Sequence, residues 1–330
     1  MGAVTPSPAQ AAEALASRGR LPEALDLLRR GVAESDPDAA FTLAAWCLSG
    51  QHVRRDLAAA RQLFERAAAA GHGDAEPIFI AFLANGTGGT RDWREALRLL
   101  ARRSSGHREA NEEIELLEAM QLTSDGDPAT VPEPEILSSR PQVALYRGLF
   151  TRRECDYLIN VASPFFTRSV VVHPDTGQLI EDPVRSSDVA AFPLAYETPA
   201  VHALNRRLAA ISATAAEQGE PLQILRYGTG QQYKAHSDAL PNAANQRICT
   251  ALIYLNDDYA GGETHFLAND LKVRGAAGDA ILFVNADRDG RPHADALHAG
   301  LPVTRGTKLL ASRWIRARPL DLSAPGATAA

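Results

Sequence analysis

The segment RYGTGQQYKAHSD (residues 226–238) ends in a His-x-Asp pair, and HAGLPVTRGTK (residues 298–308) begins with a further histidine. On a β-strand the side chains alternate between the two faces, so His236 and Asp238 are expected to point the same way. Two imidazoles and one carboxylate on one face are the ligands of non-haem Fe(II) centres that keep positions open for a chelating keto acid and O2. The sequence therefore predicts an iron site made by His236, Asp238 and His298, the last coming from a distant strand.

His-x-Asp occurs three times in this chain, so the surroundings of each pair must decide which one binds metal. His173 and Asp175 lie in HPDTG, where the proline and the Asp-Thr-Gly sequence are typical of a turn. His293 and Asp295 follow the polar segment DRDGRP, and the next histidine, His298, is too close to return on a separate strand. We expect both of these pairs to be solvated loop residues. The pair at positions 236 and 238 is instead followed by apolar strands expected at residues 248–255 and 280–285.

A lysine near the C-terminus suggests which keto acid is bound. The distal carboxylate of 2-oxoglutarate must be neutralised inside an apolar barrel, and a buried cation does this. In TKLLASRWI (residues 307–315) the alternation places Lys308, Leu310, Ser312 and Trp314 on one face, which is expected to line the pocket. The alternative is an ordinary edge-strand lysine that limits aggregation, and for Lys308 taken alone this is the better interpretation.

At this point the chain resembles a known family, the prolyl 4-hydroxylase-like Fe(II)/2-oxoglutarate dioxygenases, over residues 141–318. Several ordered blocks with matching spacing are more specific than any single motif. The blocks are LYRGLFTRRECDYLINVASP, RSVVVHPDTGQLIEDPVRSS, PLQILRYGTGQQYKAHSD, TALIYLNDDYAGGETHF, GDAILFVNADRDG and ALHAGLPVTRGTKLLASRWI. The resemblance implies a double-stranded β-helix, or jelly-roll, domain with buttressing helices.

The resemblance also implies roles for individual residues. It makes His236, Asp238 and His298 the iron ligands, pairs Lys308 with the distal carboxylate of 2-oxoglutarate, and gives Tyr227 a hydrogen bond to this cosubstrate. No catalytic residue beyond the metal centre is implied. Asp238 argues against the halogenating branch of the superfamily, in which a small residue replaces the carboxylate.

Further positions match with alternatives left open. Tyr254, Ser312 and Trp314 correspond to residues that line the cosubstrate pocket, although aromatic residues on strands are more often part of the core. The resemblance places the substrate groove near Glu220, Arg247 and Arg316. Arg316 stands where a histidine is common, and GGETHFLAN lacks the proline that often follows the phenylalanine. These departures do not affect the metal ligands, but they leave the identity of the substrate undetermined.

The activity implied by the resemblance is hydroxylation of an unactivated C–H bond, coupled to conversion of 2-oxoglutarate into succinate and CO2. Fe(II), 2-oxoglutarate and O2 are then required, with ascorbate as reductant, and the expected substrate is a prolyl residue of a protein or peptide, hydroxylated at C4. One alternative is a hydroxylase of a free amino acid or peptide natural product. An alternative of another class is a repeat-based interaction adaptor with a vestigial oxygenase domain, against which the intact set of His236, Asp238, His298 and Lys308 stands.

The N-terminal third contains an internal repeat with an offset of 36 positions. This offset is typical of paired-helix repeats, and the long loops between the helices make the pattern resemble Sel1-like tetratricopeptide repeats. Two fuller copies, one abbreviated copy and a closing helix at residues 112–120 are expected. The positions that recur are Asp38, Ala39, Trp46, Gly50, Asp56, Ala60, Leu63 and Phe64, which return as Asp74, Ala75, Phe82, Gly86, Asp92, Ala96, Leu99 and Leu100.

The predicted organisation is α+β and multidomain: a helical-repeat solenoid at residues 1–120, a proline-rich linker at 121–140, the oxygenase domain at 141–320 and a disordered tail at 321–330. Thr151 with Glu154 predicts a capping box for a helix ending at Ala162, and Thr198 begins a second helix that runs to about Ala215. Residues 169–187 are expected to form a lid over the substrate. The concave surface of the repeats favours capture of the substrate protein, with a structural appendage or a homodimer contact as alternatives.

Composition limits the setting. A formal charge of −6 gives no reason to expect a nucleic-acid partner, and no apolar stretch reaches the length needed to cross a membrane. The three cysteines lie in apolar segments, which favours buried thiols over a disulfide framework. Without a recognisable leader in its first twenty residues, the chain is expected to be cytoplasmic.

Overall fold

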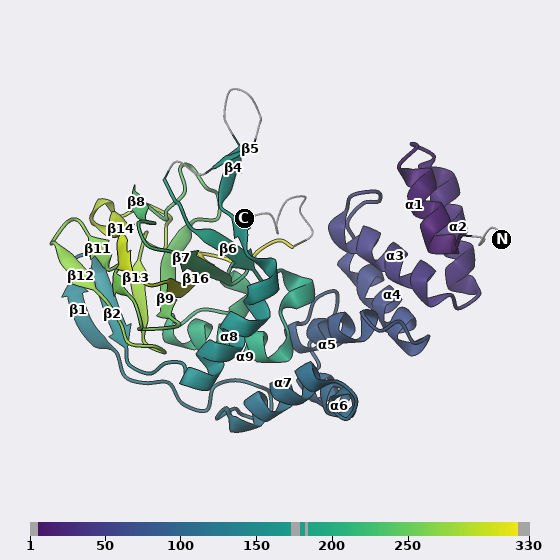
Figure 1. Cartoon of the computed structure of the whole chain (residues 1–330), viewed down its shortest axis with the longest axis horizontal. Helices are drawn as coiled ribbons and strands as arrows, with labels where there is room; N and C mark the ends of the chain where they lie inside the picture. Colours follow the sequence, from purple (N-terminus) through teal and green to yellow (C-terminus); the bar gives the residue numbers. More distant parts are fainter. Residues whose placement is uncertain (1–5, 173–178, 182–183, 323–330) are drawn as a thin grey trace.

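The computed structural model describes residues 6–172, 179–181 and 184–322, and Figure 1 shows a helical part that leads into a β-rich part. Within these residues no helix is long and apolar enough to span a bilayer. The helices are α1 (Pro8–Ala16), α2 (Leu21–Ala33), α3 (Pro37–Ser49), α4 (Leu57–Ala69), α5 (Ala75–Asn85), α6 (Trp93–Ser104), α7 (Arg108–Ala119), α8 (Arg152–Ala162) and α9 (Pro199–Ile211), with short 3-10 turns η1 (Ser163–Phe165), η2 (Leu194–Tyr196), η3 (Ala216–Gln218) and η4 (Ala294–Ala296).

The repeat is visible in how the N-terminal helices begin and end. The Asp56 carboxylate accepts from a backbone N–H in the first turn of α4 at 2.9 Å, and Asp92 does the same for α6 at 2.9 Å. Helices α3 and α5 both end at a glycine in the left-handed conformation, Gly50 and Gly86, with φ of 72° and 79°. Only glycine adopts this conformation without strain, so the same stop signal recurs 36 positions later.

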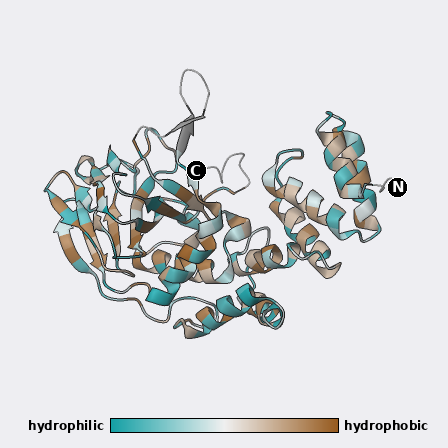
Figure 2. Ribbon diagram, in the orientation of Figure 1, coloured by the Kyte–Doolittle hydropathy of each residue, from teal (hydrophilic) through white to brown (hydrophobic). Residues whose placement is uncertain are grey.

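The helical part divides between two hydrophobic cores. Helices α1 to α4 pack around one core, which contains Leu28, Trp46 and Phe64 and is joined by Ala75 and Phe82 of α5. Residues of α5, α6 and α7 instead join the core of the β-rich part, where Trp93 and Leu100 share a cluster with α8 and α9. Figure 2 shows α5 as a largely hydrophobic helix, in keeping with its place between the two cores. The second half of the repeat array is therefore packed as part of the oxygenase fold.

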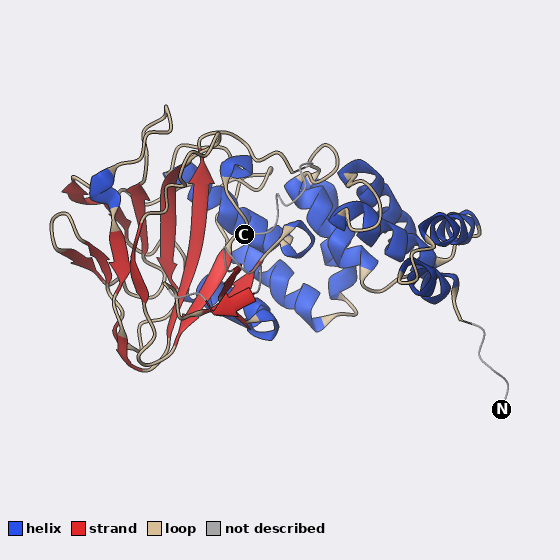
Figure 3. Cartoon of the chain, turned by 90° about the horizontal axis from the view of Figure 1, so that it is seen from above, coloured by secondary structure: helices blue, strands red, loops and turns tan. Residues whose placement is uncertain are grey.

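The β-rich part is built from two facing sheets, which Figure 3 shows gathered beside the helices. The main sheet has the order β1-β2-β13-β9-β16-β7-β6-β3, and a four-stranded sheet has the order β12-β11-β14-β8. The strands are β1 (Glu135–Ser139), β2 (Gln142–Tyr146), β3 (Thr167–Arg168), β4 (Val170–Val172), β5 (Leu179–Glu181), β6 (Asp188–Ala191), β7 (Gln223–Tyr227), β8 (Tyr233–His236), β9 (Arg247–Tyr254), β10 (Ala260–Gly261), β11 (Thr264–Phe266), β12 (Leu271–Val273), β13 (Ala280–Val284), β14 (His298–Gly300), β15 (Val303–Arg305) and β16 (Lys308–Arg316).

The two helices predicted to buttress the sheet do so. Thr151 and Glu154 form the expected capping box at the start of α8, and Thr198 caps α9. Helix α9 ends at Ile211 rather than near Ala215, because the chain turns away at Ala213, whose φ is 52°. Both helices cover the face of the main sheet that carries the odd-numbered residues of β9, so its even-numbered residues face the second sheet.

Several predicted boundaries can be compared with these elements. Strand β1 lies inside the stretch predicted to be a linker. Its two apolar residues, Ile136 and Leu137, are flanked by prolines and serines, so the sequence gives little indication of a strand. The strand forms because this segment pairs with β2. In the predicted lid, β4 and β5 pair as an antiparallel hairpin. The predicted turn with His173 and Asp175, residues 182–183 and the predicted tail from residue 323 onward lie outside the described residues.

Candidate iron and 2-oxoglutarate site

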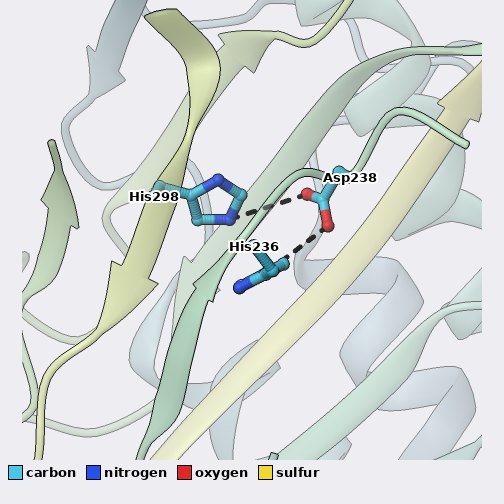
Figure 4. Close-up of side chains that lie close together, drawn as sticks. All are labelled: His236, Asp238 and His298. Atoms are coloured by element: carbon cyan, nitrogen blue, oxygen red, sulfur yellow. Dashed lines mark ion pairs between the residues drawn. The ribbon is translucent and has the colours of Figure 1, made fainter. Parts of the chain in front are cut away.

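Two neighbouring strands of the four-stranded sheet, and the turn that follows one of them, bring the three predicted iron ligands together. His236 is the last residue of β8 and His298 is the first of β14, and the antiparallel register places them directly opposite each other. Their ligand atoms and those of Asp238 all lie within 4.8 Å of one another. Figure 4 shows the three side chains gathered around one point. Among the described residues this is the one cluster of such side chains, so His293 and Asp295 form no comparable group.

The strand that carries His236 is shorter than the sequence indicates. β8 ends at His236, and Asp238 lies in the turn that follows rather than on the strand itself. The carboxylate nevertheless reaches the imidazoles, with 3.6 Å to Nε2 of His236 and 3.8 Å to Nε2 of His298. The prediction that His236 and Asp238 point toward the same site was correct. The cause is the turn after β8, however, and not the alternation of side chains along a strand.

Hydrogen bonds orient each ligand toward the centre of the site. The Nδ1 atoms of His236 and His298 lie 2.8 Å and 3.0 Å from the carbonyl oxygens of Lys234 and Ala296. An Nδ1–H that donates to a carbonyl leaves the Nε2 lone pair as the metal donor. Both imidazoles therefore present Nε2 on the side where Asp238 lies.

Asp238 is held by a short chain of polar side chains. The Thr250 hydroxyl donates to its Oδ2 at 2.6 Å, and the Asn285 amide donates in turn to the Thr250 hydroxyl at 2.8 Å. All three side chains are buried. This chain fixes the carboxylate in place, as groups behind metal ligands commonly do.

The protonation states suit a divalent cation. Burial lowers the pKa of His298, which keeps its imidazole neutral. Burial by itself would raise the pKa of Asp238, but its hydrogen bond with His236, the nearby imidazoles and the Thr250 hydroxyl outweigh burial and hold this pKa below its ordinary value. Two imidazoles and one carboxylate are the donor set of open Fe(II) sites, so the residues present fit the metal.

Lys308 lies in the same pocket and is 3% exposed. It is the first residue of β16 and pairs in register with Tyr227 of β7. Its ammonium group donates to the carbonyl oxygen of Gly262 at 2.7 Å, and burial lowers its pKa to about 8. A lysine ammonium has three N–H donors, so a carboxylate can complete its hydrogen bonding.

The expected face of β16 lines this pocket. Lys308, Leu310, Ser312 and Trp314 all contribute, as the alternation predicted. The other lining residues are Leu225, Tyr227, Tyr233, His236, Asp238, Leu252, Thr264, His298 and Gly300. The pocket thus combines leucine and tryptophan side chains with the three metal ligands and a lysine.

Tyr254 occupies a different place from the other predicted pocket residues. It is fully buried among the core residues of the facing sheets, and its hydroxyl donates to the carbonyl oxygen of Val273 at 3.1 Å. The Lys308 ammonium lies 5.7 Å from the centre of its ring. Tyr254 therefore supports the lysine end of the pocket from behind, and a direct bond to the cosubstrate stays a prediction.

The three residues predicted for the substrate groove form one ion-pair cluster. Glu220 is 3% exposed and accepts from Arg247 at 2.7 and 2.8 Å and from Arg316 at 2.5 Å. The Arg247 guanidinium also stacks on Trp314, 3.7 Å from the ring centre. Since Trp314 lines the pocket, this cluster connects directly with the site.

Sequence reasoning missed two residues next to the metal ligands. The Tyr233 ring stacks on the His236 imidazole, with 3.5 Å between the centres and 14° between the planes. Thr250 holds Asp238, as described above. Thr250 was detectable as the one threonine in the apolar run ICTALIYL, on the same face as Leu252 and Tyr254. Tyr233 gave no comparable signal, because residues 233 and 236 are three positions apart and would lie on opposite faces of a regular strand.

Comparison with known proteins agrees with this geometry. A family model described as the 2OG-Fe(II) oxygenase superfamily matches residues 222–316. Prolyl 4-hydroxylase 1 of Arabidopsis thaliana is 34% identical over 203 residues, which are 56% of this chain and 72% of that protein. Probable prolyl 4-hydroxylase 10 of the same plant is 30% identical over 238 residues, 64% of this chain and 82% of that protein. The chain belongs to the prolyl 4-hydroxylase-like family of 2OG-Fe(II) oxygenases.

Solved structures of the family are also similar. The viral collagen prolyl hydroxylase of Paramecium bursaria Chlorella virus-1, in its 2OG complex, is 27% identical with a TM-score of 0.43, and the match covers 53% of this chain and 96% of that one. A prolyl-4-hydroxylase of Pseudomonas putida is 19% identical with a TM-score of 0.40, covering 53% of this chain and 92% of that one. Its membership of this family, shown by the sequence matches, makes the chain a 2-oxoglutarate-dependent dioxygenase that uses Fe(II) and O2.

Proposed function

We propose that this oxygenase hydroxylates a prolyl residue of a protein or peptide at C4 and releases succinate and CO2. One observation carries the proposal: His236, Asp238, His298 and Lys308 line a single buried pocket. The relatives at 30–34% identity that are named prolyl 4-hydroxylases support prolyl C4 as the position.

The three metal ligands and Lys308 are proposed to bind different parts of the reacting complex. His236, Asp238 and His298 would hold Fe(II), which together with 2-oxoglutarate and O2 supplies the oxidising power needed to hydroxylate a C–H bond. Lys308 would pair with the distal carboxylate of 2-oxoglutarate, and Tyr227, its neighbour across the β16–β7 ladder, would donate a hydrogen bond to the cosubstrate. Ser312 would offer a hydroxyl to the same molecule.

The walls of the pocket keep water away from the reacting groups. Leu225, Leu252 and Leu310 line it, and each is less than 10% exposed. An apolar enclosure of this kind limits unproductive side reactions and strengthens the charge pairing with Lys308. Ascorbate is proposed as the reductant that restores the metal after turnovers without substrate.

The substrate is proposed to enter past Trp314. There the Glu220, Arg247 and Arg316 cluster offers two guanidinium groups and one carboxylate near the pocket, which suit hydrogen bonds to a peptide backbone. Arg316 adds a second cation to Glu220, and this contact can shape the preference for a particular peptide. A free amino acid or peptide natural product is the competing substrate class.

The helical repeats are proposed to recruit the substrate protein. Helices α1 to α4 surround a separate core that only α5 shares with the oxygenase part, and residues of α5 to α7 complete the oxygenase core. A homodimer through this unit is the alternative role. The cysteines that the structure describes are free thiols, which favours the reducing conditions of a cytoplasmic location.

Mass spectrometry of candidate substrates tests the proposal. The purified protein with Fe(II), 2-oxoglutarate and ascorbate is incubated with a proline-rich peptide library, and in parallel with free amino acids. A mass gain of one oxygen on peptidyl proline, absent with His298→Ala, is the expected result. Hydroxylation confined to free amino acids would replace the proposed substrate class, whereas oxygen insertion in neither set would contradict both.

A further inference from the structure

One end of the main sheet is uncovered on the face where α8 and α9 pack. Strand pairing places Cys249, Leu282 and Val284 on this face, because Cys249 lies opposite Val284 and the next pair along holds Leu282. Their strands, β9 and β13, each have a neighbour on both sides in the sheet. Leu282 and Val284 are nevertheless partly exposed. Apolar side chains on interior strands are normally covered by a second layer, and this end of the sheet lacks one.

The cover is missing because α9 stops short of this end of the sheet. The helix ends at Ile211, and Ala213 then takes a left-handed conformation with φ of 52°. This conformation carries a free-energy cost for a residue with a β-carbon. The turn is closed by the Ser212 and Thr214 hydroxyls, which lie 2.7 Å apart. The chain therefore forms a wall beside the exposed strands and does not lie over them.

The uncovered face is the floor of a cavity of about 690 Å³, here called the outer-face cavity. Its floor includes Cys249, Leu282 and Val284, and the turn after α9 forms one wall. The loop that follows β13 forms another wall, through Arg288 and His293. A cavity of this size lies within the range of roughly 300–1,000 Å³ that small-molecule sites occupy.

The loop after β13 gives the rim of the cavity a positive charge. Arg291 pairs with both aspartates of this loop, Asp287 at 3.3 Å and Asp289 at 3.2 Å. Arg288, which lines the cavity, forms no hydrogen bond or ion pair within the part of the chain that the structure describes. The His293 ring lines the same rim. Because Asp287, the acidic residue of the lining, is already paired, the rim presents a free guanidinium beside an imidazole, and a carboxylate is the group that these donors suit.

The outer-face cavity is separate from the iron pocket but touches the elements that support it. The two share no lining residue. Cys249 faces the cavity, and the next residue, Thr250, faces the other side of the sheet, where its hydroxyl donates to Asp238 at 2.6 Å. The His293 N–H donates to the Asn285 carbonyl oxygen at 2.8 Å, and the Asn285 amide donates to Thr250. A ligand in the cavity therefore contacts the strand and the loop that hold a metal ligand in place.

We infer that the outer-face cavity binds a small amphipathic carboxylate. Its apolar body lies on β9 and β13 and covers Leu282 and Val284, and its carboxylate pairs with Arg288 beside His293. The apolar floor favours this ligand over a purely polar anion, and the charged rim favours it over a neutral apolar molecule. The inference does not depend on which substrate the iron site hydroxylates.

The experiment is isothermal titration calorimetry of the full chain with three probes: decanoate, 1-decanol, which has the same chain without the charge, and acetate, which has the charge without the chain. Probe concentrations stay below micelle formation. Anaerobic Fe(II) and 2-oxoglutarate are present at saturation, so that the iron pocket is occupied.

Three variants accompany the wild type. Arg288→Gln removes the free cation of the rim, and Ala317→Phe fills the cavity from a half-buried position of its lining. Arg305→Gln is the matched control, since it removes an equal charge from an exposed position on β15, outside the lining. The melting temperature and the Kd for 2-oxoglutarate check that each variant retains its fold. If Ala317→Phe does not fold, the exposed Arg288 still tests the inference.

Decanoate should bind the wild type, and its Kd should rise roughly tenfold in Arg288→Gln, as expected for the loss of one charge-assisted hydrogen bond. Binding should be lost in Ala317→Phe and unchanged in Arg305→Gln. Decanol should bind roughly tenfold more weakly than decanoate, with no response to Arg288→Gln, and acetate should not bind measurably.

Four outcomes would overturn the inference. They are no binding of decanoate by the wild type, equal binding of decanoate and decanol, retention of decanoate binding in Ala317→Phe, and a response to Arg288→Gln no larger than the response to Arg305→Gln.

Discussion

Replacing Lys308 with methionine should stabilise the protein while removing its affinity for 2-oxoglutarate. Burial lowers the pKa of Lys308 from 10.5 to about 8. At 1.36 kcal/mol per pH unit, the buried charge costs about 3 kcal/mol of folding free energy at neutral pH. Methionine is a similar length, but it leaves the Gly262 carbonyl oxygen without the 2.7 Å hydrogen bond, at a cost of about 1 kcal/mol. The net expectation is a gain of about 2 kcal/mol.

The difference in unfolding free energy between the wild type and Lys308→Met should depend on pH. Because the pKa of Lys308 is lower in the folded protein than in the unfolded chain, its penalty is complete below about pH 8 and disappears as the pH rises to 10.5. The wild-type protein should therefore gain stability relative to Lys308→Met across this interval.

Urea unfolding without ligand, at pH 7 and pH 10, measures this effect. Lys272→Met is the matched control, since that side chain is 49% exposed and its loss should change the unfolding free energy by less than about 0.5 kcal/mol. With Fe(II) and 2-oxoglutarate under anaerobic conditions, the order should reverse, because the ligand stabilises only the wild type. A Lys308→Met variant that is less stable at pH 7, or a difference that does not change with pH, would refute the reasoning.

Three further predictions concern parts of the molecule around the site. Thr250→Val removes the hydroxyl that donates to Asp238, and should weaken Fe(II) binding by roughly 10- to 100-fold in an anaerobic titration; an unchanged affinity would show that Asp238 needs no support. Glu220→Gln should loosen both Arg247 and Arg316 and raise the KM for a peptide substrate several-fold, with the Kd for 2-oxoglutarate unchanged; an equal loss of both would mean that the cluster only maintains the fold. A chain starting at residue 121 should fail to fold, because it lacks Trp93, Leu100 and their neighbours in the shared core, and a cooperative thermal transition for this fragment would contradict that expectation.

The metal ligands and Lys308 were predictable because each lies in a short local pattern that matches an ordered block of a known family. A His-x-Asp pair, a later histidine and a lysine on an alternating strand need no knowledge of long-range packing. The structure brings them into one pocket, as that pattern predicted. The same local logic predicted the α8 capping box, which depends on residues three positions apart.

Other features depend on contacts that a linear pattern does not contain. The apolar faces of α5, α6 and α7 indicated helices, but nothing in their spacing indicated that they pack on α9 rather than on more repeats. The tie between Glu113 of α7 and the first turn of α9 joins residues 87 positions apart. Likewise, β1 becomes a strand through its pairing with β2, so its sequence looked like part of a linker.

The most direct test of the central claim is anaerobic addition of Fe(II) and 2-oxoglutarate to the purified protein, read as the weak visible charge-transfer band of the chelated metal. The band should appear for the wild type and be absent in His298→Ala and in Lys308→Met at cosubstrate concentrations that saturate the wild type. Oxygen should then produce succinate only where the band was present. A folded wild-type protein that shows no band and releases no succinate would contradict the account, and would leave the helical repeats as the functional part of the chain.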